Sequence, residues 1–328
     1  MCIRDRLGPA NLTISTANAT NNAPETIGVD GAANVTWSAA TTLTLNAGRN
    51  ITVNSGAVIS NTAAATGFNA IVMNANRGAN PVTGNFSGIS IGAATLSTAG
   101  GNLVFNGTGG NNGSNAGGSN LGIVLTSAAL TTSAGAIRLN GQGGTSAGNI
   151  DIGMFIQGST SIQATGSGSV SVTGTGGGSA GSAANAGIGV PTGASVSLRT
   201  ASGALSITGT GGPGSSSYGI WQQGALALQS GSGTITLSGS AASTINGLQF
   251  DAGSTSITSA SGDILLLADR MNFTGVTGAT AGTLALRPLT AGRAITIGAA
   301  DTTTSLGLSA TCLLYTSPSP RDGLLSRM

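Results

Sequence analysis

The sequence predicts an all-β protein, a right-handed parallel β-helix in which short strands and Gly-rich turns form one coil after another. Three observations lead to this fold class. The composition is unsuited to helices, a unit of about 30–35 residues repeats along the chain, and apolar residues two positions apart recur inside each unit.

The composition disfavours helices. Only 6% of the 328 residues are charged, against roughly 25% in typical soluble proteins. All eleven basic residues are Arg, His and Lys are absent, and Glu25 is the single Glu. Lys and Glu normally cover helix faces, and each of the 56 Gly would cost about 1 kcal/mol in a helix interior. Disorder is the other interpretation of such bias, but it usually accompanies high net charge and few β-branched residues, which is not the case here.

Five segments repeat in the same form: "NLVFNGTGG", "AIRLNGQGG", "SVSVTGTGG", "ALSITGTGG" and "TITLSGSAA". Their first glycines recur at a nearly constant period and are Gly107, Gly141, Gly174, Gly209 and Gly239. Each unit continues with a glycine and a short apolar stretch ("GIVL", "GMFI", "GIGV", "GIWQ", "GLQF") and then a third stretch. That third stretch closes on a glycine in every unit: Gly135, Gly168, Gly203, Gly233 and Gly262.

Apolar residues lie two apart within these stretches, as in Leu103 and Phe105 or Ile137 and Leu139. This spacing places both side chains on one face of a strand. Three strands separated by Gly-rich turns form one triangular coil, and we expect the glycines at its corners to supply positive φ. One coil cannot bury its inward residues alone, so coils stack and pair in parallel.

Crossovers between parallel strands are overwhelmingly right-handed, which gives the predicted hand. At about 30 residues a coil, the body forms about ten coils and about 48 Å of rod. The apolar pairs Leu43/Leu45 and Ile51/Val53, followed by Val58, predict shorter coils in the N-terminal third. An antiparallel β-sandwich is the alternative topology, since "NG" occurs at 106–107 and 140–141, but repetition at one period favours the solenoid.

The chain divides into three parts. Residues 8–311 form a single β-helix domain, with repeat units of about 30–35 residues from 102 to 262. The stretch after 262 departs from the period but still supplies strands in "GTLALRP" and "AITIGAA".

Segments 1–7 and 312–328 differ in composition from the body. They hold both cysteines, Cys2 and Cys312, and four of the eleven Arg. Both resemble translated sequencing-adapter sequence, so we interpret them as non-native and the chain as an internal fragment. The body then carries seven Arg and seven acidic residues, a net charge of zero.

Three stretches of the body share a family likeness: "TWSAATTLTLNAGRNITVNSGAVI" at 36–59, the G-x-G-G units at 107–242 and "LRPLTAGRAITIGAAD" at 286–301. In these stretches the body resembles the filamentous haemagglutinin-like exoproteins, large secreted β-helical adhesins of Gram-negative bacteria. The resemblance implies export by two-partner secretion or an autotransporter route. The outer-membrane export partner or barrel that this requires is not recognisable in the chain.

Catalytic, metal and cofactor sites are not predicted. The carboxylates of the body are spread along it: Glu25, Asp30, Asp151, Asp251, Asp263, Asp269 and Asp301. Asp251 and Asp263 are twelve positions apart, less than half a coil, and a role in turns and caps is favoured over a catalytic pair. The Gly-rich units lack the Lys of a phosphate-binding loop and the Asp of a calcium-binding repeat.

Nucleic-acid binding is disfavoured because the body is neutral and has no basic stripe. Arg138 and Arg199 are expected on the solvated face. Thr pairs in "TTLTLN" and "TITLS" do not recur in a register that would form an ice-binding ladder. The longest apolar run, "ILLLA" at 264–268, is too short to span a bilayer, so no direct membrane insertion is expected.

One surface feature is a candidate ligand-binding site. In the second stretch of each unit, the residue between the two inward positions is Val124, Phe155, Gly189, Trp221 or Gln249. If this phase holds, Phe155 and Trp221 point outward on one face near Tyr218, where they could contact glycans or a protein partner. If the phase slips, both rings belong to the core.

The sequence therefore predicts a non-enzymatic adhesive segment at the bacterial cell surface, a rod that displays binding surfaces for host or neighbouring-cell glycans or proteins. The alternatives are a β-helical polysaccharide-active enzyme or carbohydrate-binding domain, and a passive stalk or biofilm matrix repeat.

Overall fold

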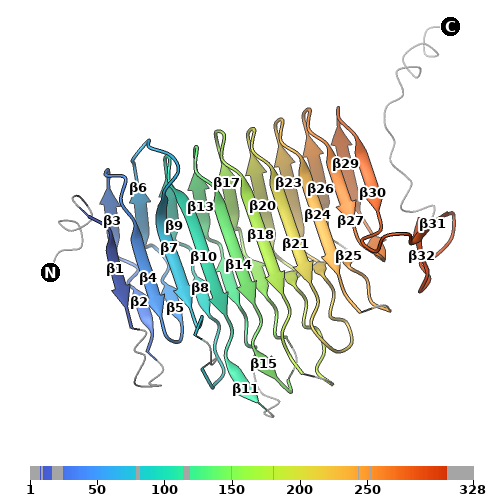
Figure 1. Ribbon diagram of the computed structural model, residues 1–328, viewed down its shortest axis with the longest axis horizontal. Helices are drawn as coiled ribbons and strands as arrows, with labels where there is room; N and C mark the ends of the chain where they lie inside the picture. Colours follow the sequence, from blue (N-terminus) through green and yellow to red (C-terminus); the bar gives the residue numbers. More distant parts are fainter. Residues whose placement is uncertain are drawn as a thin grey trace, which may run out of the picture.

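The computed structural model describes residues 8, 10–16, 25–78, 82–113, 119–148, 150–179, 181–242, 244–251 and 253–308. Coils follow one another along its length (Figure 1). The terminal segments 1–7 and 312–328, with both cysteines, lie outside the described residues.

Three long sheets form the walls of the stack. The first has ten strands: β1 (Leu12–Ser15), β4 (Leu43–Ala47), β7 (Asn69–Ala75), β10 (Asn102–Thr108), β14 (Ile137–Gln142), β18 (Val170–Thr175), β21 (Leu205–Thr210), β24 (Ile235–Ser240), β27 (Ile264–Leu267) and β30 (Leu284–Arg287). The second has nine: β2 (Ile27–Val29), β5 (Ile51–Val53), β8 (Ile89–Ile91), β12 (Ile123–Thr126), β16 (Met154–Gln157), β19 (Ile188–Val190), β22 (Ile220–Gln222), β25 (Leu248–Phe250) and β28 (Met271–Phe273).

The third sheet also has nine strands: β3 (Asn34–Trp37), β6 (Val58–Asn61), β9 (Thr95–Thr98), β13 (Ala129–Thr132), β17 (Ser161–Ala164), β20 (Ser195–Thr200), β23 (Ala225–Ser230), β26 (Thr255–Ser259) and β29 (Val276–Thr280). Two short pairs lie outside these walls: β11 (Asn111–Gly113) with β15 (Thr145–Ser146), and β31 (Ala294–Ile297) with β32 (Ser305–Leu308). No helix occurs in the described ranges.

The chain visits the three sheets in turn, and every strand pairing between described residues is parallel. The fold is a parallel β-helix, as predicted, and the antiparallel sandwich is excluded. The repeat register is confirmed as well. Gly107 pairs with Gly141 and Gly141 with Gly174, and the same ladder continues through Gly209 and Gly239.

The N-terminal coils are in part shorter than those of the repeat region, as predicted. Ile27 pairs with Ile51 and Asn34 with Val58, 24 positions apart in both cases, whereas Leu12 and Leu43 are 31 apart. The closely spaced apolar pairs at 43–58 belong to one coil, since β4, β5 and β6 lie in the first, second and third sheets. A still shorter coil lies at the other end, where Ile264 pairs with Leu284.

The inward side chains form one continuous apolar core that runs from Ile27 to Leu308. In the first sheet, the aliphatic residues that alternate in the repeat are buried: Leu103, Ile137, Val170, Leu205 and Ile235 have no exposed surface. Arg138 and Arg199, between inward positions, are exposed as predicted.

At the turns between the second and third sheets, glycines have positive φ as predicted, for example Gly56, Gly158 and Gly193. The repeated glycines of the units have a different role. The ladder from Gly107 to Gly239 lies within strands and does not have positive φ. This ladder faces a second glycine ladder, just before the strands of the second sheet, which consists of Gly122, Gly153, Gly187, Gly219 and Gly247. A Cβ on Gly174 would overlap the carbonyl oxygen of Gly187, and the same holds for four further pairs: Gly107/Gly122, Gly141/Gly153, Gly209/Gly219 and Gly239/Gly247. Close approach of two backbones, not turn conformation, excludes a side chain here.

The closing glycines of the units also stack without positive φ. A Cβ on Gly168 would overlap the carbonyl oxygen of Gly135 in the preceding coil, and the contact repeats at Gly203, Gly233 and Gly262. All three glycine ladders therefore permit tight contact within or between coils.

Beyond the facing glycines, the middle coils extend into a lobe that carries β11 and β15, at the lower edge in Figure 1. A buried polar ladder runs through it. The backbone N–H of Asn120 donates to Asp151 Oδ1 at 3.0 Å, that of Asp151 to Asn185 Oδ1 at 2.9 Å, and that of Asn185 to Ser217 Oγ at 3.2 Å. Each member thus satisfies a backbone donor of the previous coil, which a buried backbone requires.

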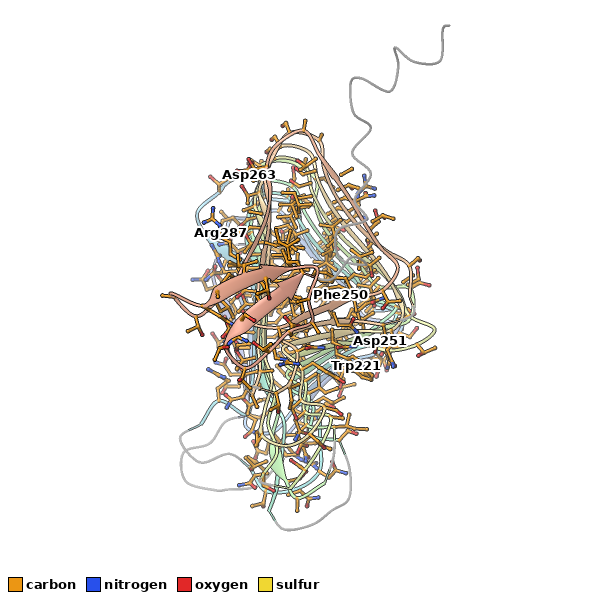
Figure 2. All side chains as sticks on the ribbon, turned by 90° about the vertical axis from the view of Figure 1, so that its right-hand side faces the viewer. Trp221, Phe250, Asp251, Asp263 and Arg287 are labelled. Carbon is orange, nitrogen blue, oxygen red and sulfur yellow. The ribbon has the colours of Figure 1, made fainter. Side chains whose placement is uncertain are left out.

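At the C-terminal end, β31 and β32 lie across the end of the coil (Figure 2). Leu306 and Leu308 of β32 are buried and belong to the main core, whereas every residue of β31 is exposed, Ile297 by 75%. The pair therefore covers the last inward residues of the stack.

Candidate functional site

The aromatic residues singled out from the sequence lie on the outer face of the second sheet. Phe155 of β16 pairs with Gly189 of β19, and Gly189 pairs with Trp221 of β22. Both rings are half-buried and lie outside the main core, so the predicted outward phase is confirmed. The other tryptophan, Trp37, belongs to the main core.

A small apolar cluster supports these rings. Leu121, Ile152 and Ala186, each one residue before a glycine of the facing ladder, are buried, and Val124, Phe155 and Trp221 pack against them. Tyr218 occupies the equivalent position in the next coil, before Gly219, and is half-buried. The three predicted residues thus lie on neighbouring ladders of one surface, and their binding role stays a prediction.

Trp221 is held by a carboxylate of the following coil. Its Nε1 donates to Asp251 Oδ2 at 3.1 Å, and Gln223 Nε2 donates to the same oxygen at 3.5 Å. Gln249 Nε2 donates to Asp251 Oδ1. Asp251 lies on the same side of the coil as Trp221 in the view along the stack, far from Asp263 (Figure 2).

Sequence reasoning missed this polar group. It compares Asp251 only with Asp263, a near neighbour along the chain, whereas the partner of Asp251 is Trp221, 30 residues before it. Trp221 pairs with Gln249 in the next coil, and Asp251 lies two residues beyond Gln249. The repeat period could therefore have placed Trp221 and Asp251 on adjacent coils.

Four further Asp carboxylates bind turns or loops, as predicted. Asp30 Oδ1 accepts from Ala32 N at 2.8 Å, and Asp263 Oδ1 accepts from Thr283 N at 2.7 Å. Asp301 accepts from Met271 N at 3.1 Å and Gly307 N at 2.7 Å. Asp151 is buried in the lobe, where Ser146 Oγ donates to its Oδ2 at 2.6 Å.

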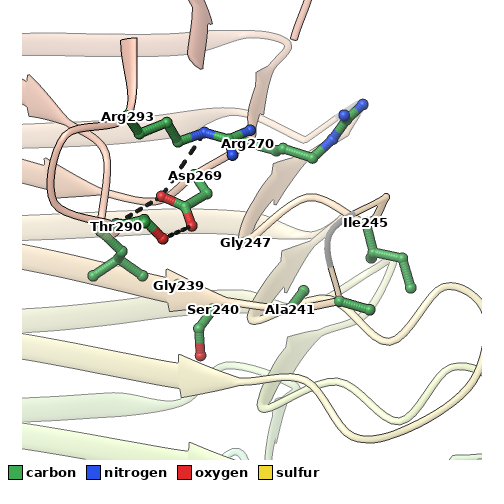
Figure 3. A pocket seen from close by; sticks show the side chains of 11 residues that line it. Gly239, Ser240, Ala241, Ile245, Gly247, Asp269, Arg270, Thr290 and Arg293 are labelled. Carbon is green, nitrogen blue, oxygen red and sulfur yellow. Dashed lines mark hydrogen bonds and ion pairs between the residues drawn. The ribbon is translucent and has the colours of Figure 1, made fainter. Parts of the chain in front are cut away.

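A pocket of about 210 Å³ opens where the lobe ends (Figure 3). Its walls come from the turn after β24 and from the shorter coil that follows, and include Asp269, Arg270, Thr290 and Arg293. Thr290 donates to Asp269 through N at 2.8 Å and Oγ1 at 2.6 Å, and Arg293 Nε lies 4.0 Å from Asp269 Oδ1.

Partial burial alone would raise the pKa of the Asp269 carboxyl. The hydrogen bonds from Thr290 and the charge of Arg293 outweigh it and hold this pKa below 3.8. Asp269 therefore stays ionised and ties the turn at 289–293 to the stack.

Comparison with protein-family models, curated proteins and solved structures found no match for this chain. Within the described ranges, no helix is long and apolar enough to cross a membrane. In the same ranges, no group of three or more Cys, Asp or Glu side chains could hold a metal ion.

Proposed function

We propose that this chain is a structural and adhesive segment of a large secreted bacterial surface protein. It is non-enzymatic and acts as a rod that holds binding surfaces away from the cell. The observation that carries this proposal is the unbroken stack, in which three parallel sheets enclose one core from Ile27 to Leu308. A rod of this kind is stiff along its length because each coil packs on its neighbours.

The same construction suits export. Almost all strand contacts join consecutive coils, so the chain can cross an outer membrane unfolded and then fold coil by coil. The body has no cysteine, so its folding needs no disulfide. On this proposal a separate outer-membrane partner or barrel, by two-partner secretion or an autotransporter route, exports the chain to the surface of a Gram-negative cell.

An adhesion assay tests the proposal. Beads coated with the full chain are expected to stay attached to epithelial or bacterial cells under flow. Beads coated with an unrelated β-helix of similar length are the control, and soluble chain should compete. Attachment no greater than the control would instead favour the passive stalk. Release of sugars from a panel of polysaccharides would favour the enzyme.

A further inference from the structure

This inference rests on the proposed adhesive function and concerns the ligand. The outward ladder of the second sheet is mostly small or polar, with aromatic rings at only two of its positions: Gly28, Thr52, Ser90, Val124, Phe155, Gly189, Trp221, Gln249 and Asn272. In a chain that is only 3% aromatic, two rings separated by one glycine form a distinct surface.

The two rings close over Gly189. A Cβ built on it would lie 3.3 Å from Phe155 Cδ2 and 3.6 Å from Trp221 Cε3. The two side chains therefore lean toward the same point over the glycine. At its other end the indole reaches Asp251, one coil further on, through Nε1. The ring thus lies along the axis of the stack and extends over more than one coil.

The indole is fixed before any ligand arrives. Leu121, Ile152 and Ala186 support the aromatic cluster, and the Asp251 carboxylate fixes the ring orientation. Gln249, which donates to Asp251, is itself held by Asn246 Nδ2 at 2.6 Å. A preorganised aromatic surface loses little conformational entropy on binding.

Asp251 can also accept further donors. A carboxylate has about four acceptor sites, and the contacts described here occupy three of them. All three donors are neutral side chains, so none of them offsets the charge of the carboxylate. Hydroxyl donors are favoured beside it, and an anionic ligand is disfavoured.

We propose that Trp221, Phe155 and Asp251 bind a pyranose ring of a neutral glycan. The apolar C–H face of the sugar packs on the indole, and sugar hydroxyls donate to the free acceptor sites of Asp251. Such a combination of an apolar platform with few fixed polar groups is typical of small-ligand sites.

Titration of the full chain with cellohexaose, maltohexaose and chitohexaose tests the proposal, with hexagalacturonate as the anionic arm. The readouts are tryptophan fluorescence and saturation-transfer NMR. At least one neutral hexasaccharide is expected to bind in the millimolar range and change the emission, whereas hexagalacturonate binds more weakly. Trp37 is buried in the core, with Nε1 bonded to Thr41 O at 3.1 Å, and provides a constant background.

Variants locate the site. Trp221→Ala should weaken binding about tenfold and abolish the fluorescence change. Asp251→Asn keeps an acceptor for the indole and should weaken binding without altering the emission of the free chain. Ser90→Ala, on the same ladder several coils away, should bind as the original chain does. Circular dichroism and thermal unfolding verify that each variant folds.

Three results would overturn the inference: no neutral hexasaccharide binds, Trp221→Ala and Asp251→Asn both bind undiminished, or hexagalacturonate binds as tightly as the neutral sugars. The adhesion assay separates this failure from that of the proposed function. If beads coated with Trp221→Ala attach as well as beads coated with the original chain, the adhesive function is supported and this site is not the one that mediates it. Sugar binding without attachment would retain the site and remove the adhesive role.

Discussion

In the middle of the stack, between residues 102 and 262, glycines allow close backbone contact at the turns of the coils. At the C-terminal end, between 263 and 308, charged side chains bind the turns. The middle holds only two Asp and two Arg, whereas the end, less than a third as long, holds three of each. The glycine ladders need coils of nearly equal length in register. Where the coil shortens, between Ile264 and Leu284, Asp263, Asp269 and Asp301 bind the irregular turns instead.

The facing glycines should give the largest effect. Gly174→Ala places a Cβ against the carbonyl oxygen of Gly187, and because that atom is backbone, the coil must open. We expect a loss of about 4 kcal/mol or more in unfolding free energy. Urea denaturation followed by far-UV circular dichroism measures it. Gly28→Ala is the matched control, since nothing lies near its Cβ position, and should stay within about 0.5 kcal/mol. Equal effects would show that close approach is not what excludes a side chain.

A leucine truncation compares the two regions directly. Leu205 and Leu284 lie on the same inward ladder of the first sheet, but Leu205 is fully buried and Leu284 only partly. Leu205→Ala should cost about 3 kcal/mol because it leaves a cavity enclosed by coils on both sides. Leu284→Ala should cost less than half as much. Hydrogen exchange would localise the loss to the coils beside each site; a larger loss at Leu284 would contradict this view of the end.

The regular middle is also where the sequence was most informative. Residues such as Leu103, Ile137 and Val170 could be placed inside because the same spacing recurs in five units, and register follows from recurrence. The reason for glycine at 174 could not be found in this way, because its contact with Gly187 depends on how two strands of a coil approach. The shorter N-terminal coils could also be predicted, from the close spacing of the apolar pairs at 43–58.

The candidate site likewise contains one feature that the sequence predicts and one that depends on contacts between coils. The outward position of Phe155 and Trp221 follows from alternation, which a single strand determines. The bond from Trp221 to Asp251 joins two coils and depends on the rotamers of both side chains, so only their placement on adjacent coils could have suggested it.

Replacing a buried carboxylate of the middle coils should destabilise the fold more than replacing an exposed one at the C-terminal end. Asp151, within the lobe of the middle coils, accepts from Asn120 N and Nδ2 and from Ser146 Oγ. Asp151→Ala leaves buried donors without an acceptor and should cost about 2 kcal/mol. Asp151→Asn retains one acceptor oxygen and should cost less, as judged by urea midpoints. The same loss for both variants would show that the volume of the side chain matters rather than its hydrogen bonds.

The smallest effect should come from Asp269 at the C-terminal end, and it depends on pH. Its pKa is lowered in the folded chain, so the unfolded chain binds more protons in acid. The stabilisation is complete above the unfolded pKa near 3.8 and disappears as the pH falls through the lower folded value. Because the side chain is 35% exposed, solvent screening limits it to about 0.5 kcal/mol. The difference in unfolding free energy between the original chain and Asp269→Asn should therefore vanish between about pH 5 and about pH 2. A difference that is unchanged across this range would show that the hydrogen bonds of Thr290 do not depend on the charge of Asp269.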